Sequence, residues 1–295
     1  MKLDPKSTKI LIVGLGLLGG CYAQALTEKG FTVRAITLEQ SSIDYAVSHG
    51  FLAGGATEPD AALIADSNLI VFALYPHIFV EWVEKYQHLF APGTVLTDVT
   101  GVKGSVVGKI QAMLRPDVEF IAAHPMAGRE VSGVENSDPA IFRGANYIVV
   151  PTEKNTEGAT VLCEELGHTL GFARVSRLSP GEHDRMIAFL SQLTHCIAVT
   201  LMCCNDEPGL EKYTGDSFRD LTRIARINDL MWSELFMENR ELLLEQMDLF
   251  TEHFAHLREC LATGNVDGMR AMMRHSTEQR ARFDKPKAKR DNSEE

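Results

Sequence analysis

A strand followed at once by a glycine-rich turn and a helix opens the chain, and this unit constrains the fold more than any other feature. The stretch TKILIVGLGLLGGCYAQAL places Gly14, Gly16 and Gly19 in a G-x-G-x-x-G pattern. In such a unit the first glycine permits the tight turn, the second lets a pyrophosphate approach the backbone, and the third allows the helix to pack closely on the strand. The phosphates then face the positive N-terminus of the helix. The pattern predicts a dinucleotide-binding unit with Gly14, Gly16, Leu17, Leu18 and Gly19 at the cofactor.

Apolar runs alternate with helix-forming segments through the first part of the chain. The runs that we expect to form strands are KILIVG, TVRAIT, NLIVFAL, TVLTDV, EFIAAHP and NYIVVP. Continuous apolar strands suit a parallel sheet that is covered on both faces, and their alternation with helices is typical of a doubly wound α/β fold. We therefore predict a Rossmann-like α/β domain with a parallel sheet over residues 1–177.

The end of the second expected strand bears on the choice between NAD and NADP. The strand TVRAIT ends at Thr37, where an acidic residue often holds the ribose of NAD, and Glu39 follows about 20 residues after the last glycine of the turn. No arginine or lysine stands between Ile36 and Asp44 to receive a 2′-phosphate. We expect NAD, with Thr37 and Glu39 among its contacts. NADP, and a role for Glu39 as a solvated loop carboxylate, stay open.

The second part of the chain has helical periodicity and carries a helix-start signal. In SPGE, Ser179 suits the N-cap, Pro180 the first helical position and Glu182 the reciprocal position of a capping box. Further helical patterns cover residues 218–228, 230–262 and 266–283. We predict an all-helical domain over residues 178–284, followed by a disordered tail at 285–295. Because its apolar faces are broad for so small a domain, we expect a homodimer formed through it. A monomeric helical domain is the alternative.

Composition and charge exclude several classes of protein. The 295 residues carry a formal net charge of −11 with one short basic cluster, KPKAKR, whereas a nucleic-acid partner requires a positive face. No apolar run reaches the roughly 18 residues that cross a bilayer, and the N-terminus lacks the apolar region of a signal peptide. The six cysteines have no CxxC spacing, and His253 and His256 have no evident third metal ligand. We expect a cytoplasmic protein with no metal, no nucleic-acid partner and no membrane association.

Two loops that follow expected strands are candidates for the chemistry, because ligands of open α/β sheets bind beyond the carboxyl ends of the strands. They are DVTGVKGSV and AAHPMAGREVSG. In the second loop, His124 follows an apolar strand and precedes Pro125, which stiffens the turn. A histidine held there beside a nicotinamide is a general base worth roughly 10²–10⁴ in rate. A turn or capping histidine is the alternative.

The helical part offers candidate substrate contacts. Three arginines follow one another at helical spacing in SFRDLTRIARINDLMW. A solvated salt-bridge surface is the ordinary interpretation, but a guanidinium such as Arg223 also binds a carboxylate in bidentate fashion. His195, near Ser191 and Gln192, fits either a polar site or a hydrogen-bonded core histidine.

The sequence resembles the prephenate/arogenate dehydrogenase family in a set of ordered motifs. These are VGLGLLGG, DVTGVKG, HPMAGREVSG, HDRMIAFLSQLTH and FRDLTRIARINDLMW. The resemblance runs through almost all of the chain. It implies an N-terminal Rossmann-like domain, a helical domain that dimerises, and an oxidative decarboxylation on the route to tyrosine. In that reaction prephenate gives a hydride to NAD and loses carbon dioxide, and its ring becomes the aromatic ring of 4-hydroxyphenylpyruvate.

The resemblance also implies roles for individual residues. His124 matches the residue that hydrogen-bonds the ring hydroxyl and takes its proton. Arg223 matches the arginine that binds a substrate carboxylate, and His195 matches the last histidine of a SHLPH segment near the substrate. Glu130 and Asp220 match acidic positions near the site entrance and its arginine.

Four positions depart from the family pattern. Gly101 stands where the family often has a serine, so a hydroxyl that helps to orient the histidine is absent. Gln192 stands where a histidine is common, and Thr37 replaces a frequent aspartate. Arg129 follows HPMAG where some members have a smaller polar residue, and it is a candidate contact for the side chain of the substrate. The sequence leaves the choice between prephenate and arogenate open.

Two other functions fit parts of the sequence. A related Rossmann reductase of hydroxy acids or imines shares the glycine turn. Such enzymes rely on a catalytic lysine in the helical half, where Lys212 is the only lysine between Lys154 and Lys285 and has a turn-like context. A non-catalytic NAD-sensing subunit would bind the cofactor without turnover, and substitution of His124 would then change nothing measurable.

Overall fold

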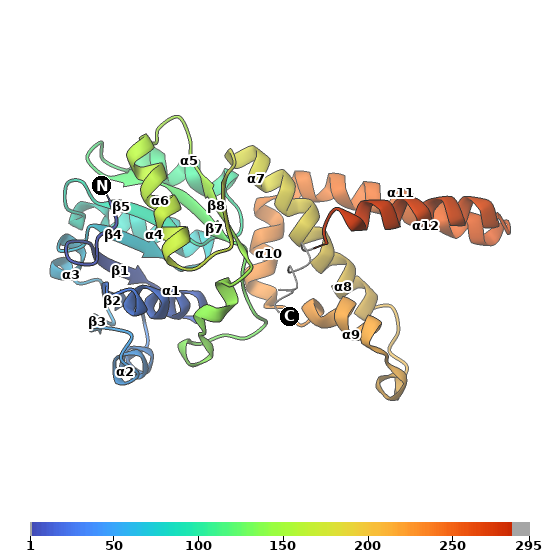
Figure 1. The fold of residues 1–295 in the computed structure, drawn as a ribbon, viewed down its shortest axis with the longest axis horizontal. Coiled ribbons are helices and arrows are strands. Elements are labelled where there is room, and N and C mark those ends of the chain that lie inside the picture. The colour runs from blue at the N-terminus through green and yellow to red at the C-terminus, as the bar shows by residue number, and fades with distance from the viewer. Residues whose placement is uncertain (1, 285–295) are drawn as a thin grey trace, which may run out of the picture. The chain divides into compact units, whose positions relative to one another are not determined.

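The computed structural model of the chain describes residues 2–284 (Figure 1). Contacts along the backbone divide the chain into two compact units, one that ends at Leu243 and one that begins at Leu244. This division falls within a helix, whereas the sequence places a domain boundary after residue 177, and that boundary stays a prediction. The expected disordered tail, 285–295, lies outside the described residues.

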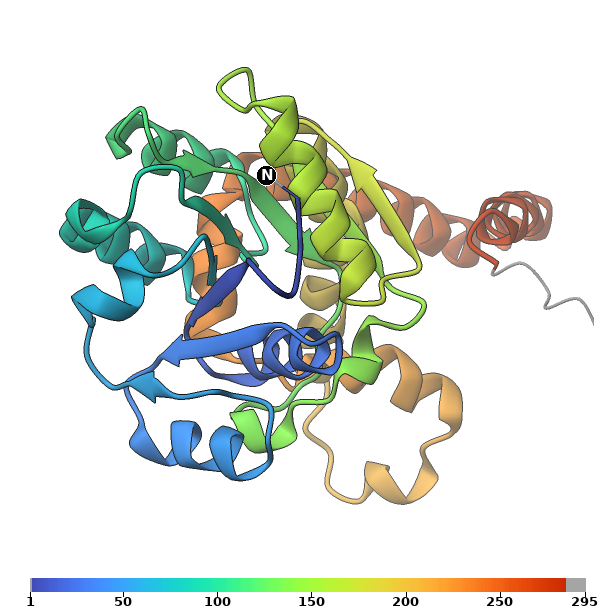
Figure 2. The same cartoon turned by 60° about the vertical axis from the view of Figure 1, so that its left-hand side comes forward.

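The first unit is built on a six-stranded sheet in which all neighbouring strands are parallel. Its strands are β1 (Lys9–Val13), β2 (Thr32–Ile36), β3 (Gly55–Ala56), β4 (Leu69–Phe72), β5 (Val95–Asp98) and β6 (Glu119–Phe120). Their order is β3-β2-β1-β4-β5-β6, so the order of the strands reverses between β1 and β4 (Figure 2). This is the doubly wound, Rossmann-like topology that the sequence predicts.

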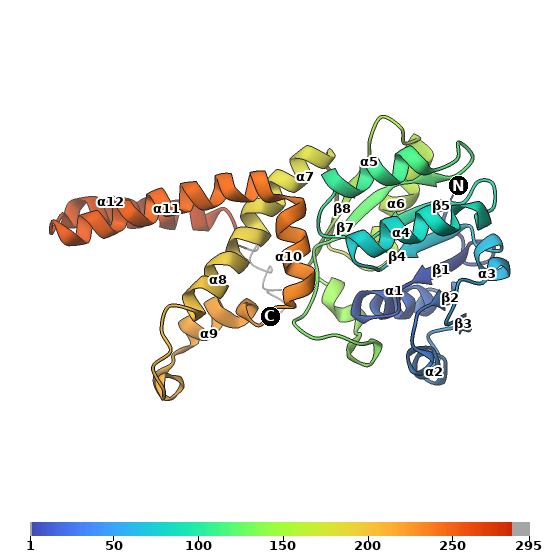
Figure 3. The same ribbon diagram turned by 180° about the vertical axis from the view of Figure 1, so that it is seen from behind.

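Helices cover both faces of this sheet. They are α1 (Leu17–Glu28), α2 (Gln40–Ser48), α3 (Ala61–Ala65), α4 (Pro76–Tyr86), α5 (Gly104–Met113) and α6 (Glu157–Thr169). α1 and α6 lie on the face seen in Figure 1, and α4 and α5 lie on the face seen from behind in Figure 3. In β1, Ile10 and Ile12 join the first core, and Leu11 and Val13 join the second. Because alternate side chains point to opposite faces, both faces of the strand are buried, which explains its unbroken apolar run.

A second sheet of three strands follows, and it differs from the prediction. β7 (Ala122–Pro125) pairs antiparallel with β8 (Asn146–Val150), which pairs parallel with β9 (Arg174–Arg177). The run EFIAAHP therefore splits between β6 and β7, and the expectation that NYIVVP joins the parallel sheet is wrong. Two side chains cause the split, because both bind the backbone of Ala123. The Asp98 carboxylate accepts a hydrogen bond from the N–H of Ala123, and the Lys103 ammonium donates one to the carbonyl of Ala123. Both backbone groups are thereby withheld from β5.

A helical stretch with a change of winding begins the remainder of the first unit. It consists of α7 (Pro180–Ile187), a π-helical segment (Ala188–Leu193) and α8 (Thr194–Met202), joined without a break. The capping box predicted from SPGE is confirmed. The Ser179 hydroxyl accepts from the N–H of Glu182, and the Glu182 carboxylate accepts from the N–H of Ser179.

By length and composition alone, the same stretch, Pro180–Met202, qualifies as a candidate membrane span. The expectation that no apolar run is long enough is therefore wrong for this stretch, because polar residues such as Gln192 and His195 interrupt the run without making its average polar. One such helix is weak evidence for a membrane, since core helices of soluble proteins meet the same criterion.

The first unit ends with α9 (Asp216–Thr222), a 3₁₀ turn (Arg223–Ala225), α10 (Asp229–Glu238) and the first residues of α11 (Arg240–Ala262). The rest of α11 and α12 (Val266–Ala281) form the helical hairpin of the second unit. The single helix expected over 230–262 is broken at Asn239, whose side chain bonds to the stretch 180–202 instead. In the second unit, Asn265 caps α12 by accepting from the N–H of Gly268 at 2.9 Å. Its two helices expose several large apolar side chains, namely Leu249, Phe250, Phe254, Leu261 and Met273.

Candidate active site

The glycine turn after β1 has the geometry that a bound pyrophosphate requires. Gly14 has φ +96°, and a Cβ there would lie 2.4 Å from the carbonyl oxygen of Ala73. A Cβ on Gly19 would lie 2.0 Å from the carbonyl oxygen of Gly14, so this position permits the close packing of α1. Gly16 is exposed, and its Cβ position has no heavy atom within 4 Å. Gly14 and Gly19 thus serve the fold, while Gly16 keeps the helix N-terminus open to an anion.

The surroundings of the turn fit NAD. Leu17 and Leu18 form the first turn of α1, whose N-cap is Gly16, a residue with no side chain to occupy the free N–H groups. At the end of β2, Thr37 is half-buried and Glu39 lies exposed at the N-cap of α2. This edge offers a carboxylate to ribose hydroxyls and no nearby cation in the sequence to neutralise a 2′-phosphate.

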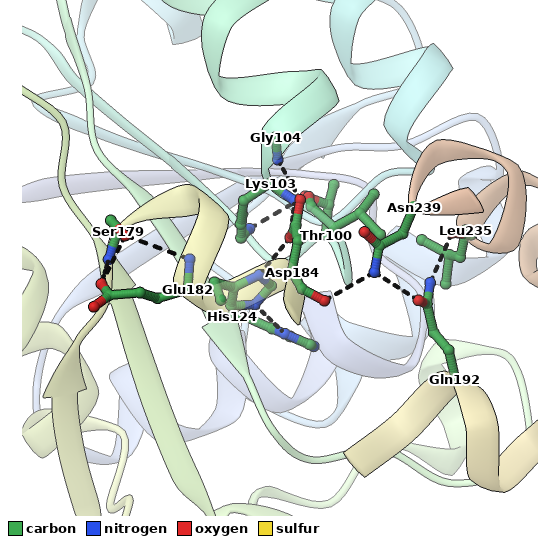
Figure 4. Close-up of polar contacts among 12 residues, drawn as sticks. Thr100, Lys103, Gly104, His124, Ser179, Glu182, Asp184, Gln192, Leu235 and Asn239 are labelled. Atoms are coloured by element: carbon green, nitrogen blue, oxygen red, sulfur yellow. Dashed lines mark hydrogen bonds and ion pairs between the residues drawn. The ribbon is translucent and has the colours of Figure 1, made fainter. Parts of the chain in front are cut away.

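His124 lies on β7 opposite Ile148 and is half-buried. Its Nδ1 is 2.9 Å from Nε2 of His183 (Figure 4). Burial lowers the pKa of His124 well below its usual range, and the neighbouring His183 and the Lys103 cation lower it further. The imidazole is therefore neutral near pH 7 and is able to accept a proton.

A buried ion pair anchors the strand that carries this histidine. Lys103 and Asp98 are fully buried, and Nζ of Lys103 lies 2.7 Å from Oδ2 of Asp98 and 2.6 Å from the carbonyl oxygen of Ala123. Oδ1 of Asp98 accepts from the N–H of Ala123 at 3.0 Å. Burial lowers the pKa of Lys103, and the Asp98 carboxylate opposes this shift. The pair fixes both backbone groups of the residue that precedes His124.

The start of α7 contributes two residues to which the sequence analysis gives no role. His183 is fully buried, and its Nδ1 lies 2.7 Å from Oδ1 of Asp184. The Asp184 carboxylate also accepts from the backbone N–H groups of Lys103, at 2.9 Å, and Gly104, at 2.6 Å, where α5 begins. The only sequence signal was the histidine–aspartate pair just inside a capped helix start, since its partners lie 80 and 81 residues away.

Gln192 holds helices together in the first unit. Its amide donates to the carbonyl of Leu235 at 2.7 Å and accepts from Asn239 at 2.7 Å. Asn239 also donates to the carbonyl of Asp184 at 2.9 Å. The glutamine that replaces a common histidine thus joins the π-helical segment to the break between α10 and α11, and it is buried among these bonds (Figure 4).

His195 lies against an aromatic ring on α10. Its ring stacks on Trp232 with 3.7 Å between centroids, and its Nδ1 lies 2.8 Å from the carbonyl oxygen of Ser191. Since a carbonyl only accepts, Nδ1 carries the hydrogen and Nε2 carries the lone pair. Burial lowers the pKa of His195, opposed by the Ser191 bond. The charges of Glu130 and Arg223 also influence this pKa, so the three side chains share one neighbourhood.

Arg223 and Glu130 form an ion pair between the 3₁₀ turn after α9 and the loop after β7. The Arg223 side chain is 63% exposed, so its guanidinium is accessible to a ligand. Arg129 points elsewhere and pairs with Asp138 at 3.1 Å. Asp220 is exposed on α9, and within residues 2–284 its side chain has no hydrogen bond. The structure thus groups Arg223 with Glu130 and His195, and it groups neither Arg129 nor Asp220 with them.

Comparison with known proteins identifies the family. The model of the nucleotide-binding domain of prephenate dehydrogenase matches residues 22–170, and the model of the dimerization domain of prephenate dehydrogenase matches residues 179–275. The glycine turn itself precedes the first matched range.

Relatives and a solved structure extend this finding over most of the chain. The prephenate dehydrogenase of Lactococcus lactis is 30% identical over 83% of this chain and 69% of its own length, and that of Bacillus subtilis is 27% identical over 84% and 69%. The crystal structure of prephenate dehydrogenase from Aquifex aeolicus, in complex with hydroxyphenyl propionate and NAD⁺, superposes with a TM-score of 0.85 at 27% identity. That superposition covers 96% of this chain and 100% of the other. The chain therefore belongs to the prephenate dehydrogenase family.

Proposed function

We propose that this protein is an NAD-dependent prephenate dehydrogenase, which converts prephenate into 4-hydroxyphenylpyruvate and carbon dioxide in tyrosine biosynthesis. The observation that carries the proposal is the likeness to a solved prephenate dehydrogenase over 96% of the chain, in a complex that contains NAD⁺ and a hydroxyphenyl acid. The neutral, half-buried His124 and the open glycine turn supply the two chemical functions that the reaction needs.

The chemistry requires a hydride acceptor and a proton acceptor. NAD⁺, held at the N-terminus of α1, accepts the hydride that leaves the ring carbon bearing the hydroxyl. His124 takes the hydroxyl proton through its free nitrogen as that carbon becomes a carbonyl. The bond to the ring carboxylate then breaks, its electron pair enters the ring, carbon dioxide leaves, and the phenolate oxygen so formed takes the proton back from His124. Aromatisation drives this last step, so the protein has mainly to orient the ring and to hold the proton acceptor.

Arg223 is proposed to bind a carboxylate of the substrate. The guanidinium fork matches a carboxylate in bidentate geometry, and its exposed position beside Glu130 leaves it open to an exchange of partners. His195, stacked on Trp232, is proposed to form one wall of the same subsite. Glu130 would hold Arg223 in place before the substrate arrives. Asp220 stays a predicted contact at the entrance.

The cofactor contacts follow from the glycine turn. Gly14, Gly16 and Gly19, with the first turn of α1, are proposed to hold the pyrophosphate, and Thr37 and Glu39 to face the ribose. Arg129 was expected to touch the side chain of the substrate. Its bond to Asp138 gives it another partner, so we keep it as a candidate specificity residue rather than a proposed ligand.

We further propose that the protein works as a homodimer in the cytoplasm. The match to a dimerization domain over residues 179–275 supports self-association. The exposed apolar side chains of α11 and α12 supply a surface that a second copy would cover.

The decisive experiment offers purified protein prephenate and arogenate, each with NAD⁺ and with NADP⁺, and follows the absorbance of the reduced nicotinamide. Reduction with prephenate and NAD⁺ is the expected result. A preference for arogenate would move the substrate assignment within the family, and a preference for NADP⁺ would contradict the role of Glu39. If the protein binds NAD⁺ but the absorbance rises in none of the four mixtures, the proposed reaction is refuted.

A further inference from the structure

We propose that His183 and Asp184 are positioning residues, which fix the tautomer of His124 so that its Nε2 lone pair faces the substrate hydroxyl. The inference rests on the proposed role of His124 as the proton acceptor. Its structural basis is a chain of hydrogen bonds that runs from the N-terminus of α5 through Asp184 and His183 to His124 (Figure 4).

The carboxylate of Asp184 sets the direction of this chain. Its two oxygens accept from the backbone N–H groups of Lys103 and Gly104 at the N-terminus of α5, where partial positive charge favours an anion. Backbone N–H groups only donate, so both oxygens act as acceptors. The side chain of Asp184 is only 7% exposed, so water hardly competes for these bonds. Asp184 is therefore a fixed acceptor for a third donor.

That third donor is Nδ1 of His183. With an acceptor at 2.7 Å, Nδ1 has to carry the hydrogen, because a lone pair there would face the lone pair of the carboxylate. Burial lowers the pKa of His183, and the Lys103 cation acts in the same direction while Asp184 opposes it. The neutral ring therefore has a hydrogen on Nδ1 and a lone pair on Nε2.

The lone pair of His183 then determines the tautomer of His124. Their facing nitrogens are 2.9 Å apart, so one hydrogen lies between them, and it has to come from Nδ1 of His124. The other nitrogen of His124, Nε2, is left with its lone pair. This is the form that accepts a proton from a hydroxyl. His183 is the only hydrogen-bond partner of the His124 side chain within residues 2–284.

Position 101, at the start of the turn before α5, contributes nothing to this hydrogen-bond chain. Gly101 has no side chain and so offers no hydrogen bond to His124. A Cβ at this position would meet Leu235 at 3.4 Å, an ordinary contact.

Three charged groups surround the two histidine rings, one from each element packed against them. Asp98 comes from β5, Lys103 from the turn before α5, and Asp184 from α7, while the rings themselves come from β7 and α7.

The first test reads the tautomers directly. Nitrogen-15 histidine NMR of the full chain at neutral pH is expected to show both His124 and His183 with the hydrogen on Nδ1. The resonances are assigned with His124→Asn and His183→Asn. Observation of His124 with the hydrogen on Nε2 would overturn the proposal. This measurement does not depend on the substrate, so it stands even if prephenate is not turned over.

The second test weakens the hydrogen-bond chain with Asp184→Asn. Oδ1 of Asp184 faces both His183 and the N–H of Lys103, and Oδ2 faces the N–H of Gly104, so an amide there leaves at least one of these groups without an acceptor. We expect kcat to fall by roughly 10²–10⁴-fold as the His124 hydrogen moves to Nε2, with KM for prephenate and Kd for NAD⁺ nearly unchanged. An unchanged kcat in a variant whose nitrogen-15 NMR shows the His124 hydrogen on Nε2 would overturn the proposal.

A matched control separates the effect of the hydrogen-bond chain on His124 from the loss of stability that follows when a helix loses its cap. Asp60 also accepts from two backbone N–H groups, those of Ala62 and Leu63, at the start of α3. Asp60→Asn is expected to lower Tm slightly and to leave kcat unchanged, because no histidine lies in its network. If Asp184→Asn does not fold, the NMR measurement on the unaltered chain decides the question.

Discussion

At the scale of single residues, the proposed base, His124, stays neutral although charged groups surround it. His124 lies near the Lys103 cation and against a second histidine, and both raise the cost of placing a positive charge on it. These surroundings suit a proton acceptor, because they keep the imidazole uncharged and its lone pair available at neutral pH.

The lowered pKa of His124 predicts how activity depends on pH. The base is protonated only below its pKa, and since that pKa lies well below 6.5, kcat/KM for prephenate should hold as pH falls through 6.5 and decline at lower pH. His124→Asn should lower kcat by roughly 10²–10⁴-fold, remove this acid limb and leave Kd for NAD⁺ unchanged. Steady-state rates across the acid range test both statements. An acid limb that survives in His124→Asn would assign it to another group.

We expect Lys103 to contribute far more to the free energy of unfolding than an exposed lysine does. Lys103→Met leaves the Asp98 carboxylate buried without its partner, which should cost about 3–5 kcal/mol of unfolding free energy. Lys9→Met is the matched control, because Lys9 pairs with Asp66 at the surface and should cost less than about 1 kcal/mol. Urea denaturation of the two variants compares them. Equal losses would show that the buried pair does not anchor β7.

Local sequence patterns predict some members of the proposed site and not others. The glycines of the turn and His124 are predicted from the sequence because each stands at a fixed offset from a strand. The hydrogen bond from the N–H of Lys103 to Asp184 joins residues 81 positions apart, and the sequence around Asp184 does not indicate Lys103 as its partner. Long-range pairs of this kind are set by how the chain folds back on itself, which periodicity does not report.

At the scale of elements, the loop after β7 and the turn after α9 meet through the pair formed by Glu130 and Arg223. If Arg223 leaves this pair to bind a substrate carboxylate, its planar fork matters more than its charge. Arg223→Lys should raise KM for prephenate at least tenfold with a smaller effect on kcat, since an ammonium cannot make the bidentate contact. Arg219→Lys is the control, because among residues 2–284 Arg219 bonds to its near neighbours Thr214 and Asp216 and not to Glu130. An unchanged KM in Arg223→Lys would count against the assignment.

The element predictions failed where side chains replaced backbone pairing. The capped helix start was confirmed because Ser179 and Glu182 act locally. The predicted helix over 230–262 is broken at Asn239, whose side chain donates to Gln192 and to the carbonyl of Asp184 while its own carbonyl accepts from the N–H of Leu243 in the next helix. The strand NYIVVP was placed in the wrong sheet for a similar reason, since the side chains of Asp98 and Lys103 occupy the backbone of β7.

At the scale of the whole molecule, the proposed homodimer is the feature most open to a simple test. The apolar side chains of α11 include Phe250 and Phe254, whose rings stack with 6.0 Å between centroids while both remain exposed. Phe254→Asp should shift the protein from dimer to monomer, because a charge buried at an interface is costly. Light scattering during size-exclusion chromatography measures the mass. His253→Asp, on the neighbouring exposed position, is the control, and a dimer that persists in both variants would place the interface elsewhere.

The π-helical segment between α7 and α8 determines where the stretch Pro180–Met202 tolerates a change of length. An α-helix turns by about 100° per residue, and a π-helical turn accommodates one residue more than an α-helical turn. Deletion of a single residue from Ala188–Leu193 would therefore let ordinary winding resume while the later side chains of the stretch kept their direction, so His195 would stay against Trp232. Deletion of a residue from the α-helical parts of the stretch would instead rotate every later side chain by about 100°. Descendants of this chain can therefore lose one residue within the π-helical segment, whereas a loss elsewhere in the stretch would turn its two ends relative to each other.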